Sequence, residues 1–440
     1  MTELPDTDPQ SRFRLFHPAG RTVRLWLLAM LVGALAAAAS VLLRSAARGV
    51  EWLATGQGGG LVDAALSLQP WQRVLVGGAG GVLAGAVLAW GNAWARRGPA
   101  GDRHLDYIDA ARHDRVDLND RTTLTRTLSA LFSVGSGASI GREGPMVQMA
   151  AWLAARLARA ISLSEKERTT LLVCGIAAGI GTVYHAPVAG VVFVLELALG
   201  FWVPHAVAPV LIASATANTL IYWFVEPLPL YAVPRLDLLP TSLGAALLAG
   251  LVFGAVGWAL LVLLERARAL FRVVRHPVWR LGLGGLFVGL ISALVPQVWG
   301  NGYSVISHVL QGQLLWQALA LVLVAKVLAT ALSSGSGAIG GVFTPSLLVG
   351  AASGSVLAQL ALLALPAAWV GDPKVMAVIG MAAVLAAVTH APLMAVVMVM
   401  EMTHAFELTL PTMLACGVAY AVSSQFGARP LYGNPIEAHG

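Results

Sequence analysis

The sequence is poor in charged residues. Only 11% of its 440 residues are Asp, Glu, Lys or Arg, less than half of the fraction of about 25% that is usual in soluble domains. Hydrophobic residues make up 57% of the chain, and the mean hydropathy is +0.75. A soluble protein of this length could not cover so much apolar surface with so few charges. We therefore expect a large integral membrane protein with roughly ten spanning or half-spanning helices.

Cysteine is scarce as well, and the chain has no recognisable secretory leader. Cys174 and Cys416 both lie inside apolar runs, so we expect two small buried hydrophobic residues and not a disulfide or metal pair. Residues 1–24 lack the apolar core and cleavage site of a signal peptide. They carry four arginines ahead of the first apolar run, which predicts a cytoplasmic N-terminus.

The apolar runs are continuous and do not alternate, which excludes a transmembrane barrel and predicts an all-α chain. We expect a cytoplasmic segment at 1–24, membrane repeats at 25–225 and 240–426, and a tail at 427–440 too short for a soluble domain. The charged loop 95–126, with seven Arg and six Asp, is expected on the cytoplasmic side together with both termini. The net charge of +6 fits basic cytoplasmic loops, so it does not indicate a nucleic-acid partner.

The chain contains an internal repeat. SVGSGASIGREGP at 133–145 matches SSGSGAIGGVFTP at 333–345, and YHAPVAGVVFVLE at 184–196 matches THAPLMAVVMVME at 389–401. WGN occurs at 90–92 and again at 299–301. Two halves with Gly- and Pro-broken apolar segments are typical of transporters and channels. Because broken helices in a membrane must face protein or a water-filled cavity, we expect 135–145 and 335–345 to converge on a permeation path.

Two segments within this repeat predict an anion site. GREGP at 141–145 and GVFTP at 341–345 each precede an apolar run, and proline favours the first turn of a helix. Each segment therefore predicts a helix start inside the membrane, where free N–H groups and the positive end of the helix dipole are available. Two such starts facing one cavity would bind an anion without a full positive charge, which allows the ion to leave again.

Glu143 falls within this predicted anion site, and two roles are open for it. An ionised carboxylate would occupy the anion position and block the path, whereas a protonated one would move away. In that role Glu143 is both gate and proton acceptor, as is typical of a carboxylate in a membrane interior. The alternative is that Glu143 caps the N-terminus of its own helix.

These motifs, with PLY at 430–432, resemble the CLC family of chloride channels and proton-coupled chloride exchangers. The resemblance covers residues 25–432 and is closest to the bacterial ClcB-type branch, which lacks cytoplasmic nucleotide-binding domains. It implies an all-α membrane fold of two inverted-topology repeats with broken and tilted helices. It also implies a homodimer with one pathway per subunit in a bacterial inner membrane, contacts with lipids, chloride as bound substrate ion, and no other cofactor.

The resemblance assigns roles to individual residues. It implies that Glu143 is the external gating glutamate, that the backbone amides of Val342 and Phe343 bind the central anion, and that the Tyr432 hydroxyl binds it from the inner side. Other anion contacts are expected around the gate, at Gly141, Arg142 and Gly144. The alternative for Tyr432 is an aromatic anchor at the membrane interface.

The chain departs from the family pattern in two places. The family's motif Gly-Ser-Gly-x-Pro supplies a serine hydroxyl to the anion, but the corresponding residues 101–105 read GDRHL. Ser136 and Ser336 align elsewhere, and we expect them to serve helix packing. Exchangers of the family usually carry two adjacent glutamates, and here the second position is Leu197, which cannot carry a proton.

The second departure leaves two functions open. Leu197 favours a glutamate-gated, voltage- or pH-sensitive chloride channel, and proton/chloride exchange is the alternative. Glu196 and its repeat mate Glu401 either belong to a proton path or are buried structural carboxylates at helix ends. An organic-anion carrier fits the two motifs less well, and no paired catalytic groups at helical spacing indicate an enzyme.

Three further polar residues lie at or within apolar runs. His185 and His390 are mirror positions in the repeat, each before Ala-Pro, so we expect a shared capping role and no metal. Lys326 either adds positive potential to the anion path or extends to a membrane surface.

Overall fold

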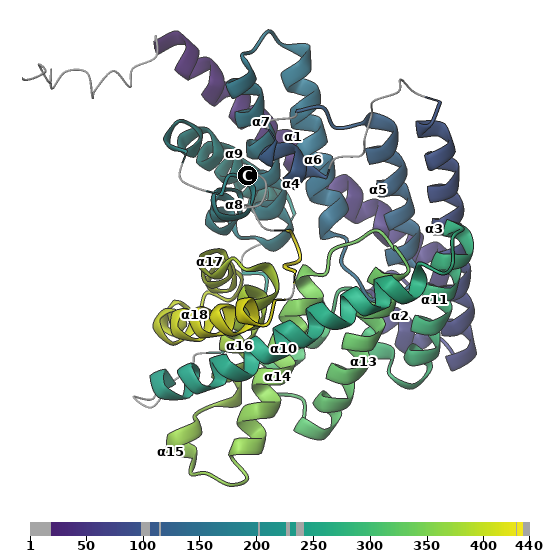
Figure 1. The fold of residues 1–440 in the computed structure, drawn as a ribbon, viewed down its shortest axis with the longest axis vertical. Helices are drawn as coiled ribbons and strands as arrows, with labels where there is room; N and C mark the ends of the chain where they lie inside the picture. The colour runs from purple at the N-terminus through teal and green to yellow at the C-terminus, as the bar shows by residue number, and fades with distance from the viewer. Residues whose placement is uncertain are drawn as a thin grey trace, which may run out of the picture.

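The computed structural model describes residues 19–97, 106–113, 116–200, 203–225, 229–234, 242–427 and 429–433. Within these ranges the regular structure is helical (Figure 1). The first half contains α1 (Ala19–Thr55), α2 (Leu61–Ser67), α3 (Pro70–Ala95), α4 (Tyr107–Arg112), α5 (Asp120–Gly135), α6 (Glu143–Ala160), α7 (Glu165–Tyr184), α8 (Pro187–Phe193) and α9 (Pro204–Phe224). The second half contains α10 (Ser242–Phe271), α11 (Pro277–Leu294), α12 (Tyr303–Leu310), α13 (Trp316–Gly335), α14 (Phe343–Ala361), α15 (Ala367–Val370), α16 (Pro373–Thr389), α17 (Pro392–Thr403) and α18 (Thr409–Gln425).

In the described ranges, nine helices are long and apolar enough to cross a membrane. They are built on α1, α3, α9, α10, α11, α13, α14, α16 and α18. The spans on α14 and α16 are the most buried of the nine, which places these two helices at the centre of the fold. The chain is therefore a multi-pass, all-α membrane protein, as the composition predicts. Cys174 and Cys416 are buried free thiols, as expected.

The two halves repeat the same packing. In the first half α6 packs on α7 and α1 on α9, and in the second half α14 packs on α16 and α10 on α18. The halves join along α3 and α11, which lie side by side in Figure 1. At this contact a Cβ on Gly81 would overlap the Leu281 carbonyl, and one on Gly285 would overlap the Gly77 carbonyl. Glycine at these positions lets the two backbones touch, as is usual for helices that pack within a membrane.

The two repeats each contain a helix break at a histidine, between α7 and α8 in the first repeat and between α16 and α17 in the second. His185 is the C-terminal cap of α7 and His390 is that of α16. Both have a left-handed backbone conformation, with φ of 55° and 57°. Each is followed by a proline that starts the next helix, α8 or α17. The histidines therefore cap helix C-termini, as their mirror positions predict. The described residues contain no group of three or more His, Cys, Asp or Glu that could hold a metal ion.

Two half-buried carboxylates join the α8 and α17 regions. Glu196 accepts hydrogen bonds from the first amides of α17 at 2.7 and 3.3 Å, and Glu401 accepts from the first amides of α8 at 2.7 and 3.1 Å. Each carboxylate thus satisfies the free N–H groups at the start of a helix in the other repeat. This is the arrangement expected of structural carboxylates at helix ends.

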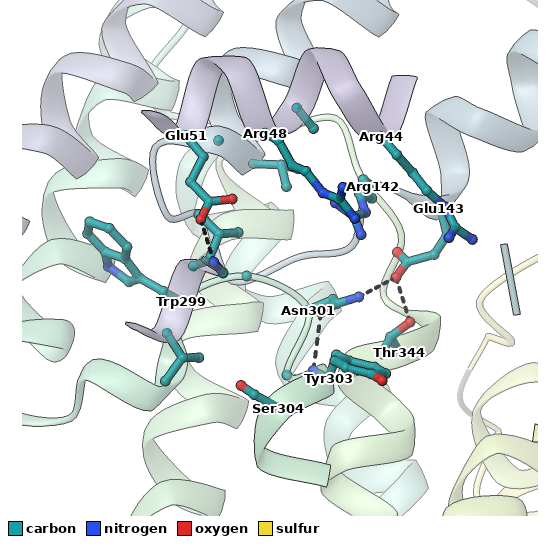
Figure 2. A pocket seen from close by; sticks show the side chains of 18 of the residues that line it. Arg44, Arg48, Glu51, Arg142, Glu143, Trp299, Asn301, Tyr303, Ser304 and Thr344 are labelled. Atoms are coloured by element: carbon teal, nitrogen blue, oxygen red, sulfur yellow. Dashed lines mark hydrogen bonds between the residues drawn. The ribbon is translucent and has the colours of Figure 1, made fainter. Parts of the chain in front are cut away.

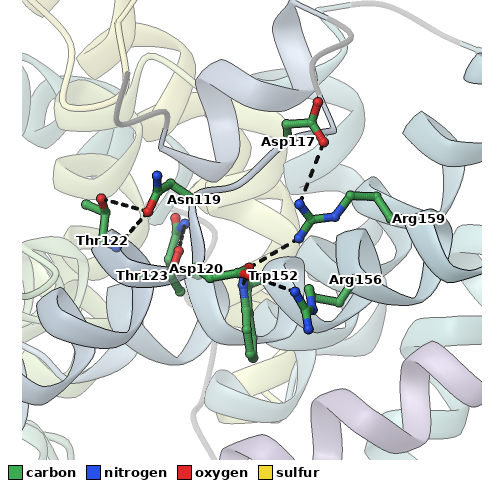
Figure 3. A network of polar contacts seen from close by, with 9 residues as sticks. Asp117, Asn119, Asp120, Thr122, Thr123, Trp152, Arg156 and Arg159 are labelled. Atoms are coloured by element: carbon green, nitrogen blue, oxygen red, sulfur yellow. Dashed lines mark hydrogen bonds and ion pairs between the residues drawn. The ribbon is translucent and has the colours of Figure 1, made fainter. Parts of the chain in front are cut away.

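A polar network fixes the C-terminal part of α6 against the start of α5 (Figure 3). Asp120 accepts hydrogen bonds from Trp152 Nε1 at 2.6 Å, from Arg156 at 2.7 Å and from Arg159 at 3.2 Å. Asn119 caps α5 by accepting from the Thr122 amide at 2.9 Å. Exposed ion pairs add little stability individually. The part-buried bond from Trp152 to Asp120 fixes the position of α6, whose other end carries Glu143.

We predict that Glu401→Leu destabilises the protein by about 2 kcal/mol, because the first amides of α8 lose a charged acceptor. Glu401→Gln keeps one acceptor oxygen and should cost about half as much. Thermal unfolding in detergent measures both effects. Glu407→Leu, at an exposed position on the turn before α18, is the control. Equal melting temperatures for the Glu401 and Glu407 variants would show that the capping bonds do not stabilise the fold.

Candidate functional site

The two glycine-rich segments meet through a pair of backbone hydrogen bonds. The Gly141 amide donates to the Gly341 carbonyl and the Gly341 amide donates to the Gly141 carbonyl, both at 2.8 Å. These residues occupy the same position in the two repeats, so the contact is reciprocal. The convergence of 135–145 with 335–345 expected from the repeat is therefore present in the fold.

Both segments lead directly into helix starts. α6 begins at Glu143 after the cap residue Arg142, and α14 begins at Phe343 after Val342. Neither cap residue makes a side-chain capping bond. The first amides of an α-helix have no partner within the helix, so two positive helix ends lie next to one another. Gly144 lies in van der Waals contact with this junction, since a Cβ there would be 3.5 Å from the Gly341 nitrogen.

The Glu143 carboxylate binds across the repeats (Figure 2). Its Oε1 accepts hydrogen bonds from Thr344 Oγ1 at 2.6 Å and from Asn301 Nδ2 at 2.8 Å. Its Oε2 is buried and has no hydrogen-bond partner among the described residues. A Cβ on Gly141 would overlap this Oε2, so the carboxylate lies directly over that glycine. Oε1 thus binds donors of the second repeat and not the amides of α6.

Glu143 lines a cavity of about 520 Å³. Arg44, Arg48 and Arg142 line the same cavity, and Figure 2 shows Arg44 and Arg48 extending into it from α1, with Arg44 beside Glu143. Arg44 also donates a hydrogen bond to the Thr182 carbonyl at 2.7 Å, which holds its guanidinium in place. Arginines in a partly enclosed cavity create a positive potential that concentrates anions.

Tyr432 lies away from this cavity, against the first repeat. Its ring makes an edge contact with Phe193 of α8, with centroids 5.6 Å apart. Its carbonyl accepts a hydrogen bond from Arg112 Nη1 at 2.7 Å, and the same guanidinium donates to the Leu197 carbonyl at 2.7 and 3.0 Å. The backbone around Tyr432 is therefore fixed to α4 and to the π-helical turn Val194–Ala198 that follows α8.

Tyr107 is a candidate that the sequence reasoning missed. It is the first residue of α4, is 5% exposed, and its side chain lies close to that of Tyr432. Its amide donates to Gln148 Oε1 at 3.1 Å, which ties α4 to α6. Burial raises the pKa of both tyrosines, so both hydroxyls remain neutral donors. The available signal was a tyrosine just after the stretch that replaces the family's serine motif, and residues 101–105 themselves lie outside the described ranges.

Lys326 does not extend to a membrane surface. It is fully buried, and its ammonium donates to the Gly300 carbonyl at 2.6 Å and to the Val298 carbonyl at 3.1 Å. Both carbonyls belong to the turn that precedes Asn301. The turn that carries one of the two donors to Glu143 is thus held by the buried Lys326 side chain.

The remaining sequence candidates lie outside this junction. Ser136 and Ser336 donate to carbonyls of their own helices and fill the space above Gly80 and Gly284, which confirms a packing role. Glu196 and Glu401 bind the starts of α17 and α8, as described above. Leu197 is 2% exposed.

Comparison with known proteins decides the family. Residues 80–424 match the family described as voltage gated chloride channel. The chain belongs to this family. A ClcB-like chloride channel protein from Ralstonia nicotianae is 43% identical over 419 residues, which cover 93% of this chain and 96% of the relative. The voltage-gated ClC-type chloride channel ClcB of Salmonella typhimurium is 36% identical over 433 residues, which cover 94% and 100%. The resemblance to the ClcB-type branch is confirmed.

Solved structures confirm the CLC-like fold of two inverted repeats. The structure of a slow cyanobacterial Cl⁻/H⁺ antiporter aligns with a TM-score of 0.80 at 23% identity, covering 96% of this chain and 98% of that one. A CLC-type fluoride/proton antiporter aligns with a TM-score of 0.73 at 26% identity, covering 93% and 98%. The chain is therefore an anion-transport protein of the CLC family and not an enzyme.

Proposed function

We propose that the protein is a chloride channel gated by Glu143. The observation that carries this proposal is the position of the Glu143 carboxylate beside two adjoining helix starts, at a cavity lined by three arginines. The free amides of those starts favour an anion. An ionised carboxylate is itself an anion and competes for the same place, whereas a protonated one does not. External acid would therefore open the path.

The anion would pass from the arginine-lined cavity to the helix starts and then to the inner hydroxyls. Gly141, Arg142 and Gly144 surround the gate, and the amides of Val342 and Phe343 contact the central ion. At the inner side the Tyr432 hydroxyl donates to it. The closeness of the Tyr107 and Tyr432 side chains supports a second inner donor, Tyr107, in the role of the serine that the chain lacks.

The alternative function is exchange of chloride for protons. It is favoured by the two solved structures above, whose titles describe antiporters. Exchange needs a route for protons from Glu143 to the inner side. Leu197 cannot carry a proton, and the Glu196 and Glu401 carboxylates are occupied by helix amides, so a proton path through these two glutamates would have to break those bonds. For this reason we favour the channel.

The proposed setting follows from the relatives. We place the protein in a bacterial inner membrane, with both termini in the cytoplasm, as a homodimer in which each subunit has its own path between the repeats at 25–225 and 240–426. Chloride is the substrate ion, and lipids surround the dimer. We propose no cofactor.

The first prediction concerns the gate. In Glu143→Gln the side chain stays neutral at every pH, so chloride flux into liposomes should be nearly independent of external pH. Wild-type flux should fall as external pH rises, by up to about tenfold per pH unit for a single titrating group. Glu51→Gln, which alters another carboxylate in the same cavity, should keep the wild-type profile. A wild-type pH profile in Glu143→Gln would contradict the gating role.

The second prediction separates the channel from the exchanger. With opposed chloride and pH gradients across liposomes, a channel current reverses at the chloride equilibrium potential, and no proton flux accompanies it. We expect this result for the wild-type protein. A reversal potential displaced in proportion to the pH gradient, together with proton flux driven by chloride, would establish exchange instead.

The third prediction concerns the inner donors. Tyr107→Phe and Tyr432→Phe should each weaken chloride binding about tenfold in calorimetry, since each removes one hydroxyl donor to a charged ion. Tyr222→Phe, at an exposed position on α9, is the control and should bind chloride as the wild type does. Unchanged affinity in Tyr107→Phe would limit the inner site to Tyr432.

A further inference from the structure

The contacts of Glu143 are unevenly divided between its two oxygens. Oε1 accepts both hydrogen bonds, from Asn301 and from Thr344. Oε2 is buried without a hydrogen-bond partner in the described part of the chain. Both donors are uncharged, and both come from the second repeat. The carboxylate is thus held at the edge of the outer cavity by two neutral groups on a single oxygen.

We propose that Asn301 and Thr344 form a latch that holds the Glu143 carboxylate in the outer cavity and thereby sets the external pH at which the anion path opens. This inference rests on the proposed role of Glu143 as the gate. It names two positioning residues that act on the gate, and it identifies the turn that supports one of them.

Because both hydrogen bonds go to Oε1, the latch can hold Glu143 whether or not its carboxyl group is protonated. A proton on Oε2 leaves Oε1 as a carbonyl oxygen, which still accepts two hydrogen bonds. Protonated and ionised Glu143 can therefore both be latched. The amides of α6 and α14, by contrast, attract only the ionised form strongly. The position of the ionised carboxylate is decided by the latch, which pulls it outward, and the helix starts, which pull it inward.

The Asn301 side chain is oriented by its own contacts. Its Oδ1 accepts a hydrogen bond from the Tyr303 amide at 3.2 Å, so its Nδ2 is the atom that faces Glu143. The turn before it is fixed by the Lys326 ammonium through the carbonyls of Val298 and Gly300. Thr344 is the second residue of α14, so its hydroxyl is held by the helix start itself. Neither donor can leave Glu143 without a change in backbone or rotamer.

Several titratable groups face this carboxylate or its cavity. They are Arg44, Arg48 and Glu51 of α1, Asp63 of α2, Arg142 before α6, Tyr184 of α7, Tyr231, Tyr303 of α12, Lys326 of α13 and Tyr432. Replacing Asn301 or Thr344 by another neutral residue leaves all of these charges in place. A change in the pH profile of such variants therefore reports the latch and not a change in the local charge.

The test measures chloride flux against external pH in liposomes with the full-length protein. Asn301→Ala and Thr344→Val each remove one donor, so the outward position of Glu143 should become about three- to tenfold less populated. More protons are then needed to open the path, and the pH of half-maximal flux should move to acid by about 0.5–1 unit. Thr344→Ser restores the hydroxyl and should restore the wild-type midpoint.

Three comparisons keep the result interpretable. Ser304→Ala changes another hydroxyl in the same cavity and should leave the midpoint in place. In the Glu143→Gln background, Asn301→Ala should have no effect on the pH dependence, because no ionised gate remains. Melting temperatures in detergent should show that each variant is folded.

The outcomes separate the latch from the gate. If Glu143→Gln abolishes the pH dependence while Asn301→Ala and Thr344→Val keep the wild-type midpoint or shift it to alkaline pH, the latch is wrong and the gate stands. If Glu143→Gln retains the wild-type profile, the proposed gating function fails.

Discussion

The reciprocal pair of hydrogen bonds between Gly141 and Gly341 is the constraint on which the rest of the site depends. Inside a membrane, backbone groups that leave a helix must find partners within the protein. Here the two broken segments satisfy each other at Gly141 and Gly341, and α6 and α14 begin two residues later. A side chain on Gly141 would overlap the Glu143 carboxylate. The same glycine therefore joins the repeats and makes room for the Glu143 carboxylate.

The repeats are alike in what holds the fold together and differ where an ion would bind. The glycine faces of α3 and α11, the left-handed histidine caps and the exchanged carboxylates of α8 and α17 all occur twice. When the segments 141–145 and 341–345 are aligned, by contrast, Glu143 corresponds to Phe343 and Gly144 corresponds to Thr344. One repeat supplies the carboxylate, and the other supplies the hydroxyl that binds it. A duplicated scaffold thus carries a single asymmetric junction.

Local patterns predicted much of this architecture. The composition and continuous apolar runs predicted the helical membrane fold, and the repeated motifs predicted helix starts within 141–145 and 341–345, where α6 and α14 begin. Local patterns do not show which residues far apart in the chain lie close together in the fold. The repeated tripeptide WGN includes Asn301, but the repeat does not indicate a bond to Glu143, which lies 158 positions away in the chain. For Lys326 two roles were open, because only the fold shows which carbonyls surround its ammonium.

The two ends of the proposed path differ in charge, and that difference bears on how an ion would move. Arginines line the outer cavity, whereas the inner donors are tyrosine hydroxyls that burial keeps neutral. An anion would be concentrated by full charges outside, held by helix amides at the junction and met by neutral donors inside. Conduction requires that no single position bind the ion too tightly. In the proposed path, neutral donors at the inner end would satisfy this requirement, and Glu143 would be the ionisable group that competes with the anion at the helix starts.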